Sequence, residues 1–84
     1  MDQTPKRTAM SAADLFVLLD REYRRRRLRE CGDCFVQLPF RVDEPVNGNA
    51  NWELVIPQCK QACESILQEL VNEYQGRYVL ASPN

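Results

Sequence analysis

The chain is 84 residues long, which is enough for one domain and too short for two domains with separate cores. Its apolar content of 44% suits a folded protein, and its formal net charge of -1 provides no overall attraction to nucleic acid or to anionic membranes. No apolar run approaches the roughly 20 residues that span a bilayer, and the N-terminus has no signal-peptide pattern. We therefore expect a cytoplasmic protein with no membrane contact.

The N-terminal third predicts a tail followed by a helix. Residues 1–10 are polar and have no apolar period, so we expect a flexible tail there and a single domain over residues 11–81. Ser11 is suited to cap a helix, because its hydroxyl can accept the amide hydrogen of Asp14. Apolar side chains then recur at helical spacing, at Leu15, Phe16, Leu19 and Tyr23. The first helix is expected to extend to about Arg29.

The middle of the chain changes to a period of two, which is typical of strands with one buried face. The alternating apolar residues are Val36, Leu38, Phe40 and Val42 in the first stretch, and Trp52, Leu54 and Ile56 in the second. Residues 43–51 between them are rich in turn formers and predict a hairpin. Keeping both apolar sets on one face pairs Phe40 with Leu54. Pro39 lacks an amide hydrogen, so the first strand is expected to lie at a sheet edge or to contain a bulge.

The C-terminal part predicts a second helix and a last strand. Pro57 suits the first turn of a helix, and Gly76 is a good stop. The apolar stripe between them consists of Cys59, Cys63, Ile66, Leu67, Leu70, Val71 and Tyr74. Residues 77–81 then read as a short strand. The predicted fold is α+β in the order α-β-β-α-β, with a three-stranded mixed sheet and two helices packed on one of its faces.

The four cysteines form two closely spaced pairs, Cys31 with Cys34 and Cys59 with Cys63. An antiparallel hairpin between the pairs carries Cys34 to the level of Lys60, so the pairs should meet at one end of the domain. Because cytosolic thiols stay reduced, such spacings favour metal binding over stable disulfides. Four thiolates suit tetrahedral Zn²⁺, so the cysteines are predicted to form a structural zinc site.

This arrangement resembles the treble-clef zinc fingers, which carry two ligands on a turn, then a β-hairpin, then two ligands at the start of a helix. The resemblance covers Cys31 to Tyr74 and implies a structural zinc ion held by the four cysteines. It identifies no specific family.

Two other interpretations of the cysteines stay open. Cys59 and Cys63 lie on the apolar stripe and could be buried free thiols, as in an unmetalled small α+β protein. Alternatively, the cysteines could carry redox or disulfide chemistry, with Cys31 and Cys34 cycling between dithiol and disulfide. The chain has no histidine, which removes the commonest general base, so this thiol reading is the only enzymatic one with support.

A run of arginines near the end of the first helix is the second candidate contact region. It consists of Arg24, Arg25, Arg26, Arg27 and Arg29. Such a run can contact phosphates or an acidic partner. The alternative is structural, because Asp20 with Arg24 and Glu22 with Arg26 form acid-before-base pairs four residues apart.

Together these features predict a small, non-catalytic, zinc-stabilised binding module. A protein is the favoured partner, and nucleic acid at the basic helix end is the less favoured one; no small-molecule substrate is indicated. Phe35 lies opposite the buried set of its strand, and its exposure beside Arg41 would indicate a docking face. The main alternative function is that of a thiol–disulfide redox protein using Cys31 and Cys34.

Overall fold

The computed structural model describes residues 7–46 and 50–81. The expected flexible tail falls partly outside this range, since residues 1–6 are not among the described residues. Within the rest of that segment, Thr8–Met10 form a short strand, β1, which the polar composition gave no reason to expect.

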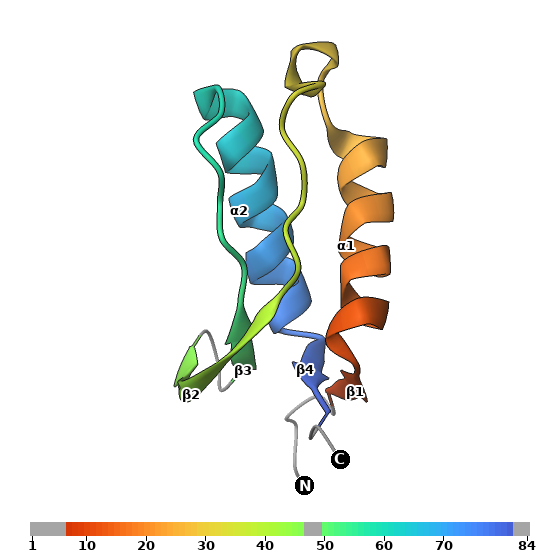
Figure 1. Ribbon diagram of the computed structural model, residues 1–84, viewed down its shortest axis with the longest axis vertical. Coiled ribbons are helices and arrows are strands. Elements are labelled where there is room, and N and C mark those ends of the chain that lie inside the picture. Colours follow the sequence, from red (N-terminus) through yellow and green to blue (C-terminus); the bar gives the residue numbers. More distant parts are fainter. Residues whose placement is uncertain (1–6, 47–49, 82–84) are drawn as a thin grey trace, which may run out of the picture.

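Two helices of equal length run side by side in opposite directions (Figure 1). The first, α1, spans Ala12–Arg26, and Ser11 caps it as predicted, accepting the Asp14 amide at 3.1 Å. It ends before Arg29 because the backbone turns extended at Arg27, and a short 3₁₀ turn follows at Arg29–Cys31. The second helix, α2, spans Gln61–Gln75.

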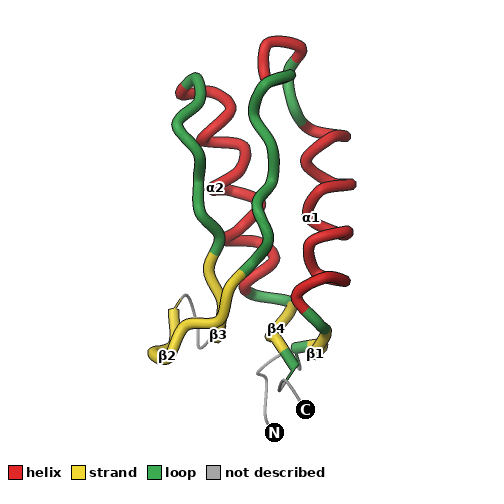
Figure 2. Tube along the Cα trace, viewed as in Figure 1, coloured by secondary structure: helices red, strands yellow, loops and turns green. Residues whose placement is uncertain are grey.

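The strands lie together at one end of the helix pair, and the cysteine-bearing turns lie at the other (Figure 2). Strand β1 pairs in parallel with β4 (Tyr78–Leu80), and β2 (Phe40–Val46) pairs antiparallel with β3 (Ala50–Glu53). The described residues thus contain two sheets of two strands, and the predicted three-stranded mixed sheet is wrong.

The division into two sheets is explained by the contacts at the edge of β4 that does not pair with β1. One edge of β4 pairs with β1. At the other edge, the side chain of Asn51 accepts from the Leu80 amide at 2.8 Å and donates to the Leu80 carbonyl at 3.0 Å. A side-chain amide therefore stands where a backbone ladder would have joined β3 to β4. The α+β character was predicted correctly, but the sheet arrangement was not.

The hairpin register also differs from the prediction. Phe40 pairs with Glu53 rather than with Leu54, and Arg41 pairs with Trp52 before an irregularity shifts the ladder. Leu38 and Phe40 are exposed, although the alternation predicted them to be buried, whereas Val36 of the same alternating set is buried at 6% exposure.

The core lies between the facing sides of the helices and is closed by Trp52 from β3. The residues that are essentially inaccessible to solvent include Leu15, Leu19, Tyr23, Trp52, Leu67 and Leu70. The indole nitrogen of Trp52 donates to the Tyr78 carbonyl at 2.9 Å, and the buried Gln75 amide donates to the Trp52 carbonyl at 2.8 Å. The strand end is therefore joined to both helices through apolar contacts and a few side-chain hydrogen bonds.

Candidate functional site

The four cysteines lie together at the end of the helix pair remote from the strands, and they form two disulfides. Cys31, in the 3₁₀ turn, bonds to Cys63 in the first turn of α2, with the Cα atoms 5.8 Å apart. Cys34 bonds to Cys59, just before α2, with the Cα atoms 6.0 Å apart. The two bonds are nested, since the outer cysteines of the sequence pair with each other and so do the inner ones.

The predicted zinc site is therefore wrong. A sulfur atom in a disulfide has no thiolate to give to a metal, and the chain has no free cysteine. Among residues 7–46 and 50–81, no group of three or more histidine, cysteine or acidic side chains is placed to hold a metal ion. The resemblance to treble-clef zinc fingers fails for the same reason. The prediction favoured metal binding over disulfides because it assumed the reducing conditions of the cytosol.

The redox hypothesis built on Cys31 and Cys34 also needs a different pairing from the one observed. A C-x-x-C redox centre cycles through a disulfide between its own two cysteines. Here each of the two bonds to a cysteine of the other pair, across the hairpin.

Two extended segments connect the disulfides to the strand end. We call residues 35–39 the first arm and residues 54–58 the second arm; Figure 2 shows both as loop. The ladder pairs Phe40 with Glu53, and the same register continued along both arms brings Cys34 opposite Cys59, the disulfide observed. The arms are thus the continuation of one hairpin, fixed in register at both ends.

Between these two fixed points the ladder of backbone hydrogen bonds is interrupted. Residues 35–38 and 55–58 make no backbone hydrogen bond within the part of the chain that the structure describes. Proline explains the interruption. Residue pairs in an antiparallel ladder alternate between hydrogen-bonded and non-hydrogen-bonded pairs. In this register Pro39 faces Leu54 and Pro57 faces Val36, and the two pairs are separated by an odd number of positions. One of the two prolines therefore occupies a hydrogen-bonded pair, where the amide hydrogen that it lacks would be required.

Four of the six large apolar side chains that the described residues expose lie on the arms or, in the case of Phe40, at the first residue of β2 directly after the first arm. Among the described residues, the exposed fractions are 53% for Phe35, 59% for Leu38, 45% for Phe40 and 55% for Val55. Leu38 and Val55 face each other in the common register, so their side chains form the centre of this surface. We call these four residues the apolar arm face. The alternation placed Phe35 and Val55 opposite the buried sets of their strands, whereas it predicted Leu38 and Phe40 to be buried.

A surface hollow of about 210 Å³ adjoins the Cys34–Cys59 disulfide. Its lining includes Glu30, Asp33 and Lys60 beside these two cysteines. Lys60 and Glu30 approach each other at 3.5 Å, and both side chains are substantially exposed. The hollow therefore places a disulfide at the surface among charged groups of both signs.

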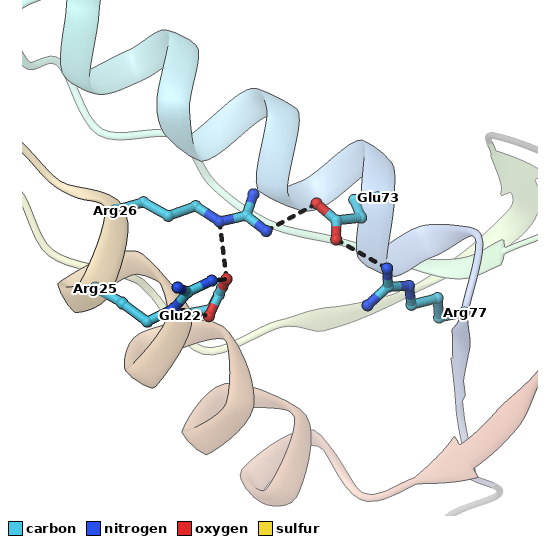
Figure 3. Close-up of polar contacts among 5 residues, drawn as sticks. All are labelled: Glu22, Arg25, Arg26, Glu73 and Arg77. Atoms are coloured by element: carbon cyan, nitrogen blue, oxygen red, sulfur yellow. Dashed lines mark hydrogen bonds and ion pairs between the residues drawn. The ribbon is translucent and has the colours of Figure 1, made fainter.

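The predicted arginine contact region is largely engaged in ion pairs within the chain (Figure 3). Arg24 bonds to Asp20 at 3.0 Å, and Arg26 bonds to Glu22 at 2.9 Å, as the spacing of four predicted. Arg26 also reaches Glu73 on α2 at 3.0 Å, so it links the two helices. That link across the helices was not visible in the sequence, because it depends on which faces of α1 and α2 meet.

Two further ion pairs surround this region. Arg25, one of its members, donates to Glu22, and Arg77, which lies outside it just after α2, bonds to Glu73 at 3.0 Å. The hydrogen bond from Arg25 is the largest cause that lowers the pKa of Glu22 from 4.5 to about 2. Contact of this arginine region, Arg24 to Arg27 and Arg29, with an external partner stays a prediction.

The chain matches no family model, no curated protein and no solved structure. No helix within the described ranges is both long and apolar enough to cross a membrane. The disulfides, the arms and the charged surface are therefore the features of this chain that bear on its function.

Proposed function

We propose that this chain is a small, non-catalytic, disulfide-stabilised module that binds an extended segment of a protein partner against its two arms. The observation that carries the proposal is the combination of unpaired backbone and exposed apolar side chains on the same two segments. We further propose that it works in an oxidising compartment, such as an extracellular one.

The compartment follows from the use of every cysteine in a disulfide. Disulfides persist in extracellular and other oxidising environments and are rare where glutathione and thioredoxin keep thiols reduced. The expected cytoplasmic location is thus not supported. Small domains that bury a modest core also gain most from such cross-links.

An extended polypeptide is the occupant that fits both properties of the arms. Its backbone can supply hydrogen-bond partners to residues 35–38 and 55–58, as in other cases of β-strand addition. Its alternate side chains can cover the apolar arm face, whose centre is Leu38 and Val55. A helix would cover the side chains but would offer no partner to the backbone, since its own backbone groups are bonded internally.

The basic helix end supports a protein partner over nucleic acid. Arg24, Arg25 and Arg26 already bond to carboxylates of the chain. A phosphate would have to displace those carboxylates, which lowers the gain from each contact.

Selection from a library of displayed unstructured peptides, followed by NMR of the oxidised chain with an enriched peptide, tests the proposal. We expect shifted and exchange-protected amides in residues 35–38 and 55–58. Leu38→Asp and Val55→Asp should each weaken binding by about tenfold or more, because a charge would face the peptide's apolar side chains. Val17→Asp is the matched control, since Val17 is 50% exposed but belongs to α1 rather than to an arm.

Three results would contradict the proposal. The first is a library that yields no binder, and the second is binding that Leu38→Asp and Val55→Asp leave unchanged. The third is concentration-dependent self-association of the free chain that protects the same amides, because a second copy would then be the occupant.

A further inference from the structure

The two disulfides differ in their access to solvent. Cys31 and Cys63 are each 1% exposed and Cys34 is 3% exposed, whereas Cys59 is only partly buried. Cys34, Cys59 and Cys63 all line the hollow, and Cys59 is the most exposed of the four cysteines. Because disulfide exchange requires a thiolate to reach a sulfur atom, access decides which disulfide reacts.

We infer that Cys34–Cys59 is a thiol–disulfide exchange site for an external dithiol and that Cys31–Cys63 is a permanent cross-link. This role is separate from peptide binding, and it differs from a C-x-x-C centre because its two cysteines lie on opposite sides of the hairpin. The chemical class of the reactant is a dithiol, either a small molecule or a pair of cysteines on another protein.

The reaction proceeds by two exchanges. One thiolate of the dithiol attacks the sulfur of Cys59; a bond forms between these sulfurs, and Cys34 leaves as a thiolate that takes a proton from water. The second thiol then loses its proton and attacks the dithiol's own sulfur in the mixed disulfide, which releases Cys59 as a thiolate that is protonated in turn. The dithiol loses two electrons and two protons and becomes a disulfide, while Cys34 and Cys59 become thiols.

The lining of the hollow favours attack at this position. Lys60, next to Cys59, presents an ammonium group that attracts an incoming thiolate, while Glu30 and Asp33 oppose a reagent of high negative charge. A neutral dithiol should therefore react faster than one that carries extra carboxylates.

Opening this bond changes the arms more than the core. Cys34–Cys59 is the fixed point that holds the arms in register at the end remote from the strands. Between it and the ladder, residues 35–38 and 55–58 have no backbone hydrogen bonds to one another. Cys31–Cys63 continues to tie the turn after α1 to the start of α2. Exchange should thus loosen the arms while the helix pair stays assembled.

Timed reduction of the oxidised full chain with dithiothreitol tests the inference. The reaction is quenched by alkylation, and the modified cysteines are located by peptide mass mapping. We expect Cys34 and Cys59 to be alkylated together, at least about tenfold faster than Cys31 and Cys63. Equal rates for the two disulfides, or faster opening of Cys31–Cys63, would overturn the inference.

Two further measurements test whether the difference in reduction rate comes from the fold and whether Cys59 is the point of attack. In denaturant both disulfides become accessible, so the rates should converge; a preference that persists there would come from local sequence and would overturn the inference. With 2-mercaptoethanol in place of the dithiol, the trapped mixed disulfide should be on Cys59. An adduct on Cys34 instead would contradict the assigned point of attack.

Paired variants separate the two bonds. Cys31→Ser with Cys63→Ser keeps only the accessible disulfide, and Cys34→Ser with Cys59→Ser keeps only the buried one. The first variant should be reduced by dithiothreitol as fast as the fast phase of the native chain, and the second as slowly as its slow phase. Since the native chain alone shows both phases, the comparison of rates stays decisive if either variant fails to fold.

Discussion

The two ends of the helix pair are held together in different ways. At the cysteine end, two disulfides join the turn after α1 to the start of α2, and the adjoining arms lack a backbone ladder. At the strand end, hydrogen bonds and apolar burial hold the elements together: Trp52 closes the core, and the Asn51 side chain joins β3 to β4. A short domain can thus combine a covalently fixed end that exposes apolar surface with a hydrogen-bonded end that buries it.

This contrast explains why the exposed surface is tolerated where it is. The prolines of the arms prevent a continuous ladder, and a hairpin without a ladder would separate unless another bond fixed its register. Cys34–Cys59 provides that bond at the far end of the arms. The arms can therefore keep unpaired backbone and the apolar arm face without losing their position.

Removal of both disulfides should have the largest effect on stability. The sequence separations are 32 and 25 residues, so the two disulfides close nearly the same loop. Either one alone lowers the conformational entropy of the unfolded chain substantially, and the second lowers it by a smaller amount. Replacing all four cysteines by serine should lower the free energy of unfolding by about 6 kcal/mol, and replacing either pair by about 2–3 kcal/mol.

Chemical denaturation of the oxidised chain and the three variants measures these differences. Removing the second cysteine pair should lower the free energy of unfolding more than removing the first. After the first removal, the remaining disulfide still closes nearly the same loop, whereas after the second no disulfide is left. Equal and additive costs would show that the two bonds constrain independent parts of the chain.

Trp52→Ala should have the next largest effect and should act at the opposite end. Trp52 is fully buried and its indole donates to Tyr78, so the substitution leaves a cavity and an unpaired carbonyl. We expect a loss of about 3–5 kcal/mol in unfolding free energy. Trp52→Phe, which keeps most of the volume, should lose less. In the oxidised chain, hydrogen exchange should rise at β3 and β4 before it rises near Cys31; a uniform rise would contradict the division into two ends.

Asn51→Ala should have a smaller effect, confined to the junction of β3 and β4. The substitution removes both hydrogen bonds between the Asn51 side chain and Leu80. A loss of about 1–2 kcal/mol is expected, together with faster exchange of the Leu80 amide. Asn51→Asp keeps the acceptor for the Leu80 amide and loses the donor to its carbonyl, so its effect should be intermediate. Unchanged exchange at Leu80 would show that the side chain does not hold this edge.

Local signals in the sequence predicted the helices well. The Ser11 cap, the apolar stripes and Gly76 located both helices to within a few residues, because each signal acts within one or two turns. The acid–base pairs of α1 were correct for the same reason. These features depend on neighbours along the chain.

Features that depend on distant parts of the chain were predicted poorly. The strand β1 forms because β4 offers it an edge, which nothing in Thr8–Met10 reveals. The hairpin register differed by one residue, and Leu38 and Phe40, which the alternation assigned to the buried face, lie at the surface. The four cysteines did converge, since chain reversal requires only the hairpin. Whether convergent cysteines bind metal or form disulfides depends on the redox compartment, which spacing does not encode.

The smallest predicted effect concerns the ion pairs that Glu22 forms with two arginines of its own helix, α1. Hydrogen bonds from Arg25 and Arg26 to Glu22 hold the pKa of this carboxyl at about 2, below its ordinary value of 4.5. Because the folded state keeps Glu22 ionised more readily than the unfolded state does, its contribution is fully present above pH 4.5 and is lost as the pH falls toward 2.

Glu22→Gln should remove this part of the pH dependence. The melting temperature of the native chain should fall more steeply than that of the variant between these two pH values, while the two curves run parallel above them. NMR titration of the Glu22 carboxyl group gives its pKa directly. A midpoint near 4.5 would show that the arginines do not lower the pKa of Glu22 in solution. Glu73→Gln is the matched control for the link across the helices: it removes the charge that pairs with Arg26 on α2 but leaves both arginine bonds to Glu22. The pKa of Glu22 should therefore stay low in that variant, which separates the pairs within α1 from the bridge between the helices.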